Sequence, residues 1–215
     1  MSEALAVIIG YLLGTIPTAY IVTRLWVGKD IRTLGGGNVG FMNVFREVGI
    51  APALIVVTTD IAKGVIAVVI AKYGLNAADS FVLISGLASV IGHNWMPWLR
   101  FTGGKGMATA IGIIIASLIA YGYPLQLGIF FVIIIIPLAI TKNVPLAMAL
   151  ALIALPFMVW ISTQSALATT MAALLFLISF IKFLPTAVLA IKNTKRKRDL
   201  IFDTIKAKSK EEKPK

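Results

Sequence analysis

Long apolar stretches recur along this chain and leave only short polar connections between them. They cover approximately residues 4–26, 50–71, 81–98, 107–121, 125–140, 144–160 and 167–191. Most approach the roughly 20 residues with which an α-helix crosses a bilayer. Hydrophobic residues make up 59% of the chain and charged residues 13%, whereas about a quarter of the residues of an ordinary soluble domain are charged. The pattern therefore predicts an all-α, polytopic integral membrane protein with about seven transmembrane helices.

The cations are distributed unevenly, and their distribution predicts the orientation. Ten of the 20 lysines and arginines lie in residues 192–215. An outside N-terminus would also place the following cations inside: Lys29, Arg32, Arg46, Arg100, Lys105 and Lys142. Cytoplasmic loops carry such an excess of cations. We therefore expect an N-terminus outside, one transmembrane domain over residues 1–191, and a basic cytoplasmic tail at 192–215 that binds anionic lipid. This distribution accounts for the net charge of +11 without a nucleic-acid partner.

Few metal-ligating side chains are available. The chain has no cysteine and one histidine, His93. Disulfides, thiolate chemistry and a transition-metal site built from several histidines are therefore excluded. We therefore expect no transition metal.

The polar segment after the first stretch is rich in glycine. It reads Asp30-Ile31-Arg32-Thr33-Leu34-Gly35-Gly36-Gly37-Asn38-Val39-Gly40-Phe41-Met42-Asn43-Val44-Phe45-Arg46. Glycines permit positive φ angles, so that successive backbone N–H groups can converge on one anion. Arg46 adds a charged fork suited to phosphate, and Asn38 and Asn43 can add donors. The alternative is a flexible re-entrant turn whose glycines only allow close helix packing, and the pattern alone does not decide between the two.

A second glycine-rich segment follows the third apolar stretch. Thr102 is followed by Gly103-Gly104-Lys105-Gly106, just before the fourth stretch. Glycines leading into a helix N-terminus, with a lysine among them, suit a phosphate. The spacing is not that of a Walker A loop, so nucleotide hydrolysis is not expected. Lys105 as a simple marker of the cytoplasmic side remains the alternative.

Two charged residues lie inside the second apolar stretch. Asp60 and Lys63 are three residues apart and therefore share a helix face, where they can pair. We expect the pair to support the glycine-rich segment, although intramembrane charges also suggest a functional site. His93 lies about one turn inside the third stretch, where a hydrogen-bonding core residue is more common than a catalyst.

The two glycine-rich segments lie on the same expected face of the membrane. Together they predict a site for two phosphate groups or one diphosphate. No carboxylate pair, Ser-His-Asp set or metal cluster accompanies them in the sequence. Such a site would act by positioning its substrates and stabilising charge.

These segments resemble the bacterial acyl-phosphate:glycerol-3-phosphate acyltransferases, the PlsY family. The matching blocks are Gly14-Thr15-Ile16-Pro17, Asp30-Ile31-Arg32, residues 35–46, Asp60-Ile61-Ala62-Lys63-Gly64, and Gly92-His93 through Pro97 to Gly103-Gly104-Lys105-Gly106-Met107-Ala108-Thr109. Three single residues depart from the family: Gly36 replaces a serine, Met42 a threonine and Pro145 a serine. The family's third block, Arg-His-Arg-Glu-Asn-Ile, is not recognisable, and Lys182-Phe183-Leu184-Pro185-Thr186 occupies its place.

The resemblance implies a function at the cytoplasmic face of the cell membrane. The primary hydroxyl of glycerol 3-phosphate would attack the carbonyl of an acyl phosphate, giving lysophosphatidic acid and phosphate for phospholipid synthesis without a cofactor. The partners would be these substrates and membrane lipids, which is compatible with a monomer.

The resemblance also implies roles for individual residues. The catalytic residues would be Lys105, Arg46 and Asn43. The phosphate-binding residues would be Gly35, Gly36, Gly37, Asn38, Val39, Gly40, Gly103, Gly104 and Gly106. Supporting roles would fall to Asp60, Lys63, His93 and Thr102.

Two alternatives remain at this point. One is a divergent homologue with another acyl acceptor or without catalysis. The other is a small anion-binding membrane transporter, which would usually place its charged groups near the bilayer midplane. Most polar groups here lie at one face, which favours an interfacial enzyme.

Overall fold

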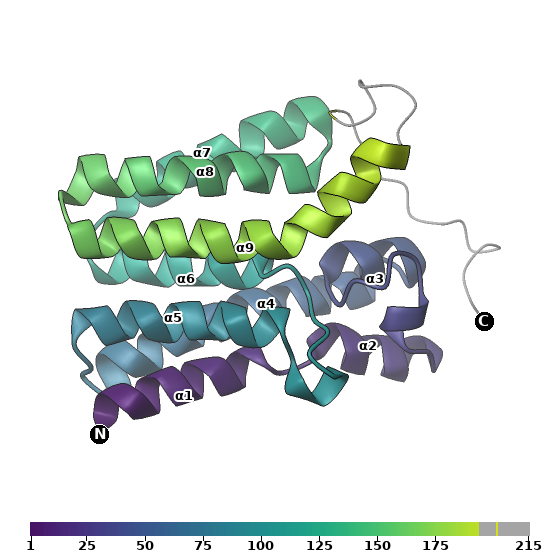
Figure 1. The fold of residues 1–215 in the computed structure, drawn as a ribbon, viewed down its shortest axis with the longest axis horizontal. Helices are drawn as coiled ribbons and strands as arrows, with labels where there is room; N and C mark the ends of the chain where they lie inside the picture. Colours follow the sequence, from purple (N-terminus) through teal and green to yellow (C-terminus); the bar gives the residue numbers. More distant parts are fainter. Residues whose placement is uncertain (194–200, 202–215) are drawn as a thin grey trace. The chain divides into compact units, whose positions relative to one another are not determined.

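The computed structural model describes residues 1–193 and 201, and its regular elements there are all helical. It divides into two compact units, of which unit 1 contains Met1–Ala116 and unit 2 begins at Ser117 (Figure 1). Unit 1 holds α1 (Ser2–Gly14), α2 (Thr18–Val27), α3 (Phe41–Glu47), α4 (Ile50–Val69), α5 (Asp79–Asn94) and most of α6 (Met107–Ala120). Unit 2 holds α7 (Pro124–Thr141), α8 (Val144–Thr163) and α9 (Ala166–Asn193).

Each predicted apolar stretch is helical, but not all of them are equally long. Five segments of the described residues are long and apolar enough to cross a membrane: Ser2–Val27, Ile50–Gly74, Pro124–Thr141, Val144–Thr163 and Ala166–Leu189. The α5 and α6 helices have only 16 and 14 residues. The chain is thus an all-helical integral membrane protein with five candidate spans, and the number seven stays a prediction.

The first stretch is broken rather than continuous. α1 ends at Gly14 and α2 begins at Thr18, with Pro17 between them. Proline lacks the N–H that an uninterrupted helix would use and clashes with the preceding turn. The break therefore leaves backbone carbonyls inside an apolar segment, where another group has to satisfy them.

Small residues let the helices of unit 1 approach one another closely. Gly10 and Gly14 of α1 lie directly against the carbonyls of Ser85 and Ser89 in α5, and a Cβ at either glycine would overlap them. Gly64 makes a similar approach from α4 to α6. Lipid gives apolar helices little reason to associate, so such close packing is what holds membrane helices together. It gives unit 1 a dense frame for the polar segments.

The polar segment between the first two stretches contains a helix that the sequence analysis did not predict. α3 starts after Gly40 and lasts only seven residues. Phe41 and Phe45, one turn apart on it, stack with ring centroids 6.0 Å apart. Val44 is fully buried in a small core that includes Ile31. A helix this short shows too little periodicity to be recognised from its sequence.

In unit 2, α8 packs against both α7 and α9. Asn143 caps α8 by accepting the Leu146 N–H at 3.0 Å. Pro145, which the resemblance suggests as a replacement for a serine, lies in the first turn of α8, where a proline displaces no helical hydrogen bond. Lys182, in the segment that we expected to replace the family's third block, is part of the α9 helix, and the loss of that block stays a prediction. The predicted basic tail, residues 192–215, lies almost entirely outside the described residues.

Candidate active site

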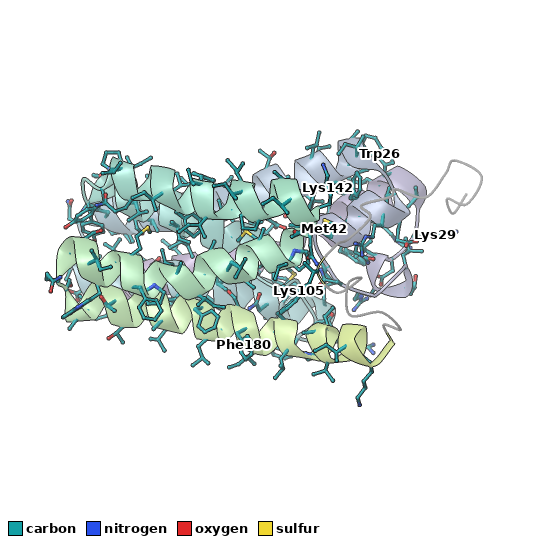
Figure 2. All side chains as sticks on the ribbon, turned by 90° about the horizontal axis from the view of Figure 1, so that it is seen from above. Trp26, Lys29, Met42, Lys105, Lys142 and Phe180 are labelled. Atoms are coloured by element: carbon teal, nitrogen blue, oxygen red, sulfur yellow. The ribbon has the colours of Figure 1, made fainter. Side chains whose placement is uncertain are left out.

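Two polar segments far apart in the sequence meet at one end of unit 1. We call residues 34–40 the glycine loop and residues 99–106 the lysine loop. The Arg32 guanidinium, just before the glycine loop, donates to the Leu99 carbonyl at 3.3 Å. The Val39 carbonyl lies 2.8 Å from the position that a Cβ on Gly104 would occupy. Lys105 is therefore in the same region as α3, as Figure 2 shows for Lys105 and Met42.

The glycine loop needs glycine at only some of its positions. Gly35 and Gly37 have φ angles of +53° and +70°, a region that other residues rarely adopt. A Cβ on Gly35 would also lie 2.5 Å from the Asn43 Oδ1 atom. Gly36 differs, because its φ is ordinary and nothing lies within 4 Å of a Cβ there. The backbone thus requires glycine on both sides of Gly36 but not at Gly36 itself.

The Asn43 side chain of α3 stabilises the glycine loop through hydrogen bonds to its backbone. Its Oδ1 accepts the Gly36 N–H at 3.3 Å. Its Nδ2 lies at 3.0 Å from the carbonyls of Leu34 and Asn38 and at 3.3 Å from that of Ile31. The side chain is 8% exposed. Asn43 therefore shapes the loop, and its role in catalysis stays a prediction.

In the lysine loop, the glycines are required mainly by lack of space. The Gly104 N–H donates to the His93 carbonyl at 3.1 Å, and a Cβ on Gly104 would overlap the His93 imidazole. Gly106 has a φ of +74°, and a Cβ there would lie 2.7 Å from Val90. The glycines of this loop therefore allow close packing against α5. This packing holds the segment with Lys105 at the end of α5.

Two cations of the site lie near each other. Lys105 precedes α6 and Arg46 lies on α3. Burial, together with repulsion from the Arg46 charge, lowers the pKa of Lys105 below that of an ordinary lysine. Two cations drawn together in a partly buried place favour binding of an anion, which would relieve their repulsion. This arrangement suits phosphate groups.

A buried cluster of charged groups lies beneath these loops. Lys63 Nζ is 2.8 Å from Asp60 Oδ1, and both side chains are at most 3% exposed. The predicted pairing is therefore confirmed. His93 Nδ1 is 3.6 Å from the same carboxylate oxygen, and Lys63 also donates to the Ile16 carbonyl at 3.3 Å. The cluster thus joins the break between α1 and α2 to α4 and α5, and His93 extends it to the lysine loop.

Other polar residues belong to this region although the sequence analysis gave them no role. Asp30 and Arg32 form an ion pair at 2.6 Å. Hydrogen bonds from Arg32 hold the pKa of Asp30 below its usual range. The Glu47 carboxylate is buried beside Gly35. Asn94 is fully buried, and its amide has no hydrogen-bond partner within the described part of the chain. The Asp-x-Arg spacing was the one signal that could have identified a local ion pair.

Comparison with known proteins agrees with the resemblance seen in the sequence. Residues 4–192 match the protein-family model for glycerol-3-phosphate acyltransferase. Glycerol-3-phosphate acyltransferase 1 of Dehalococcoides mccartyi is 46% identical over 199 residues, which cover 93% of this chain and 96% of the relative. The glycerol-3-phosphate acyltransferase of Synechococcus sp. strain JA-2-3B'a(2-13) is 43% identical over 164 residues, or 76% of this chain and 78% of the relative.

Solved structures support the same relationship. The crystal structure of PlsY (YgiH), an integral membrane glycerol 3-phosphate acyltransferase, in its glycerol 3-phosphate form has a TM-score of 0.80 at 28% identity and covers 89% of this chain and 92% of that one. Its lysophosphatidic acid form has a TM-score of 0.77 at 26% identity, covering 94% and 98%. The chain therefore belongs to the glycerol-3-phosphate acyltransferase family of integral membrane proteins.

Proposed function

We propose that this membrane glycerol-3-phosphate acyltransferase uses acyl phosphate as its donor and forms lysophosphatidic acid and inorganic phosphate. The observation that carries the proposal is the close approach of two glycine-rich loops, shown by the Val39 carbonyl against Gly104 and by Arg32 on the Leu99 carbonyl. Lys105 lies in one of these loops, and its charge interacts with that of Arg46. The solved relatives hold glycerol 3-phosphate in one form and lysophosphatidic acid in the other. These are the acceptor and the product of the proposed reaction.

The residues have roles that follow from their chemistry. Arg46 and Lys105 bind the phosphate groups of the two substrates, and N–H groups of the glycine loop add neutral donors. The C1 hydroxyl oxygen of glycerol 3-phosphate attacks the acyl carbonyl carbon, and the bond from that carbon to the phosphate oxygen breaks. The departing phosphate leaves with the hydroxyl proton, so that charge and atoms balance. The cations stabilise the charge that develops between the two substrates.

The same proposal includes a topology with seven spans. An α5 of 16 residues is about 24 Å long, somewhat short of a hydrocarbon core of about 30 Å. The contact between Arg32 and Leu99 nevertheless supports α5 as a span. α4 runs away from the membrane face at which the glycine loop lies. α5 therefore has to cross back to that face, because Leu99, which follows α5, contacts Arg32. A short α6 then leads away again, and a thinned bilayer can accommodate both helices.

This topology has consequences for the whole chain. The N-terminus lies outside, and the glycine loop, the lysine loop and residues 192–215 lie at the cytoplasmic face of the cell membrane. Residues 1–191 act as one transmembrane domain, and the basic tail binds anionic lipid. A reporter fused to the C-terminus should be active only in the cytoplasm, and a reporter active outside would refute this orientation.

Activity is tested with the purified full-length protein, acyl phosphate and labelled glycerol 3-phosphate. Wild type should form labelled lysophosphatidic acid, whereas Arg46→Ala and Lys105→Ala should lose most of this activity. Lys72→Ala is the matched control, because Lys72 pairs with Asp79 at 3.5 Å in a different connection. Absence of product from wild type, in a detergent in which a known relative is active, would refute the proposal. Equal activity of the three variants would refute the site.

The buried Asp60 and Lys63 pair does not require a transport function. Both groups bond to each other or to the backbone of unit 1. These contacts support a structural role for the pair, beneath the loops rather than along a path for ions.

A further inference from the structure

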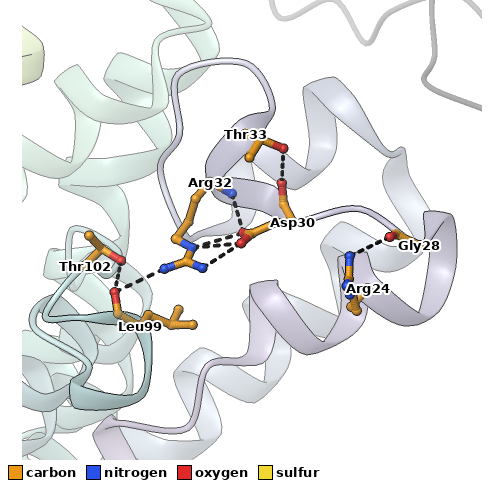
Figure 3. Close-up of polar contacts among 7 residues, drawn as sticks. All are labelled: Arg24, Gly28, Asp30, Arg32, Thr33, Leu99 and Thr102. Carbon is orange, nitrogen blue, oxygen red and sulfur yellow. Dashed lines mark hydrogen bonds and ion pairs between the residues drawn. The ribbon is translucent and has the colours of Figure 1, made fainter.

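The Asp30 and Arg32 side chains form a rigid unit in front of the glycine loop (Figure 3). Arg32 Nε lies 3.1 and 3.0 Å from the two Asp30 carboxylate oxygens, and one terminal nitrogen lies 2.6 Å from Oδ2. The Arg32 backbone N–H also donates to Oδ1 at 2.9 Å. The guanidinium lies 5.7 Å from the centre of the Tyr20 ring. Since so many contacts fix its plane, the direction of the remaining terminal nitrogen is fixed as well.

That nitrogen points to the lysine loop. It donates to the Leu99 carbonyl at 3.3 Å across 67 residues of sequence. The same carbonyl accepts the Thr102 N–H at 3.2 Å and the Thr102 hydroxyl at 2.5 Å. Arg32 therefore binds the Leu99 carbonyl oxygen, the same atom whose hydrogen bonds with Thr102 close the turn from Leu99 to Thr102.

This turn has an unusual backbone and lies close to Lys105. Arg100 and Phe101 have φ angles of +57° and +58°, and residues other than glycine seldom adopt this region, least of all twice in succession. Such conformations persist when the surroundings over-determine them. Lys105 follows Thr102 by three residues, so the turn is the nearest irregular backbone through which Arg32 can act on the position of the lysine.

The backbone of Arg32 is equally close to the glycine loop. A Cβ on Gly37 would lie 3.1 Å from the Arg32 carbonyl. The neighbouring Ile31 carbonyl accepts a hydrogen bond from Asn43. Other contacts fix the lysine loop and the turn before it to the helical frame, such as the Gly104 N–H on the His93 carbonyl at 3.1 Å and Trp98 on Thr15 at 3.1 Å. Arg32 instead connects it to the first loop.

We propose that Arg32, held in place by Asp30, is a positioning residue that sets the distance between the two phosphate-binding loops and thereby the affinity for glycerol 3-phosphate. This inference rests on the proposed function, because it assumes that both loops bind substrate. Arg32 touches no reacting atom in this scheme. It acts through the Leu99 carbonyl on the position of Lys105.

The pair is only partly buried, so its loss should affect the position of the loops much more than the stability of the fold. The Arg32 and Asp30 side chains are 32% and 22% exposed, and ion pairs near the surface contribute little to folding. Arg32→Ala should therefore lower the melting temperature by at most about 4 °C. Misplacing a binding group by about 1 Å can reduce a rate up to a hundredfold, so we expect kcat/KM to fall at least about tenfold.

The experiment measures KM and kcat for glycerol 3-phosphate in Arg32→Ala, Arg32→Lys and Asp30→Asn. KM should rise at least about fivefold in Arg32→Ala, consistent with displaced binding groups, whereas partial unfolding would lower kcat and leave KM unchanged. Lysine can bond to Asp30 or to Leu99 but lacks a fork for both, so Arg32→Lys should recover part of the loss. Arg24→Ala is the matched control: Arg24 donates to the Gly28 carbonyl at 2.8 Å (Figure 3), and its charge acts on Asp30 without a hydrogen bond to it. The control therefore removes a nearby positive charge but leaves the bond between Arg32 and Leu99 in place.

A spectroscopic measurement detects the loop directly. The chain has no cysteine, so Phe101→Cys provides one site for a nitroxide label. The label should become more mobile when Arg32→Ala is added and not when Arg24→Ala is added. An active wild type combined with an unchanged KM in Arg32→Ala would overturn this inference and leave the proposed function standing. An unchanged label mobility would overturn it as well, whereas an inactive wild type would refute the proposed function itself.

Discussion

Lys63→Met should destabilise the protein far more than removal of a surface lysine. Lys63 Nζ and Asp60 Oδ1 are 2.8 Å apart, with both side chains at most 3% exposed. At an effective dielectric constant of about 20, charges at that distance attract by about 6 kcal/mol. Burial of the two charges offsets part of this energy, but the substitution leaves a carboxylate buried without its cation. Breaking such a pair typically costs about 3–5 kcal/mol, or roughly 6–20 °C in melting temperature for a chain of this size.

The assay is thermal unfolding in detergent, followed by the fluorescence of the four tryptophans. Lys72→Met is the matched control, because the ion pair between Lys72 and Asp79 is 3.5 Å long and the Asp79 side chain is 65% exposed. It should change stability by less than about 1 kcal/mol. Adding Asp60→Leu to Lys63→Met should recover most of the loss, since no buried charge is then left unpaired. Equal melting temperatures for Lys63→Met and Lys72→Met, or a double variant no better than the single one, would refute the reasoning.

Three further predictions concern the two loops. Gly104→Ala should lower activity at least about tenfold and destabilise the protein by about 1–3 kcal/mol, because its Cβ overlaps the His93 imidazole; wild-type melting and kinetics would contradict this. Gly36→Ser has open space around its Cβ and introduces the serine that the resemblance suggests for this position, so it should keep the melting temperature within about 2 °C and maintain or raise activity; a large loss of stability would contradict the geometry of the loop. Burial and Arg46 lower the pKa of Lys105, so phosphate binding should be full below that pKa and weaken as pH rises through it. Lys105→Arg, which stays protonated, should move the alkaline limit of activity upward, and identical limits in pH–rate profiles would contradict this account.

The sequence was sufficient to predict the helices that hydropathy defines. The expected stretch over 144–160 lies within α8, Val144–Thr163, and the one over 107–121 coincides with α6, Met107–Ala120. Apolar length is a property of each segment by itself, so no tertiary information is needed. The pairing of Asp60 with Lys63 was equally predictable, since three residues along a helix place two side chains on one face.

Contacts between distant segments could not be predicted in this way. Nothing in the spacing of His93 indicates that it lies beside Asp60, or that its ring packs against Gly104. Asn43 was expected to add a donor to the site, and nothing in its spacing indicates which backbone groups of its own loop its amide contacts. A glycine or an asparagine in a motif is compatible with binding, with close packing and with bracing. Only the fold decides which of these a given residue does.

Three polar side chains of unit 1 contact the backbone in a similar way. Lys63 donates to a carbonyl at the break between α1 and α2, Arg32 to the Leu99 carbonyl, and Asn43 to carbonyls of the glycine loop. Irregular backbone next to a membrane needs such partners, since lipid offers none. These side chains therefore satisfy the backbone and orient the loops at once. Because apolar packing of the helices is independent of them, removing a partly exposed member such as Arg32 should displace the site within an intact fold, whereas removing the buried Lys63 should weaken the fold as well.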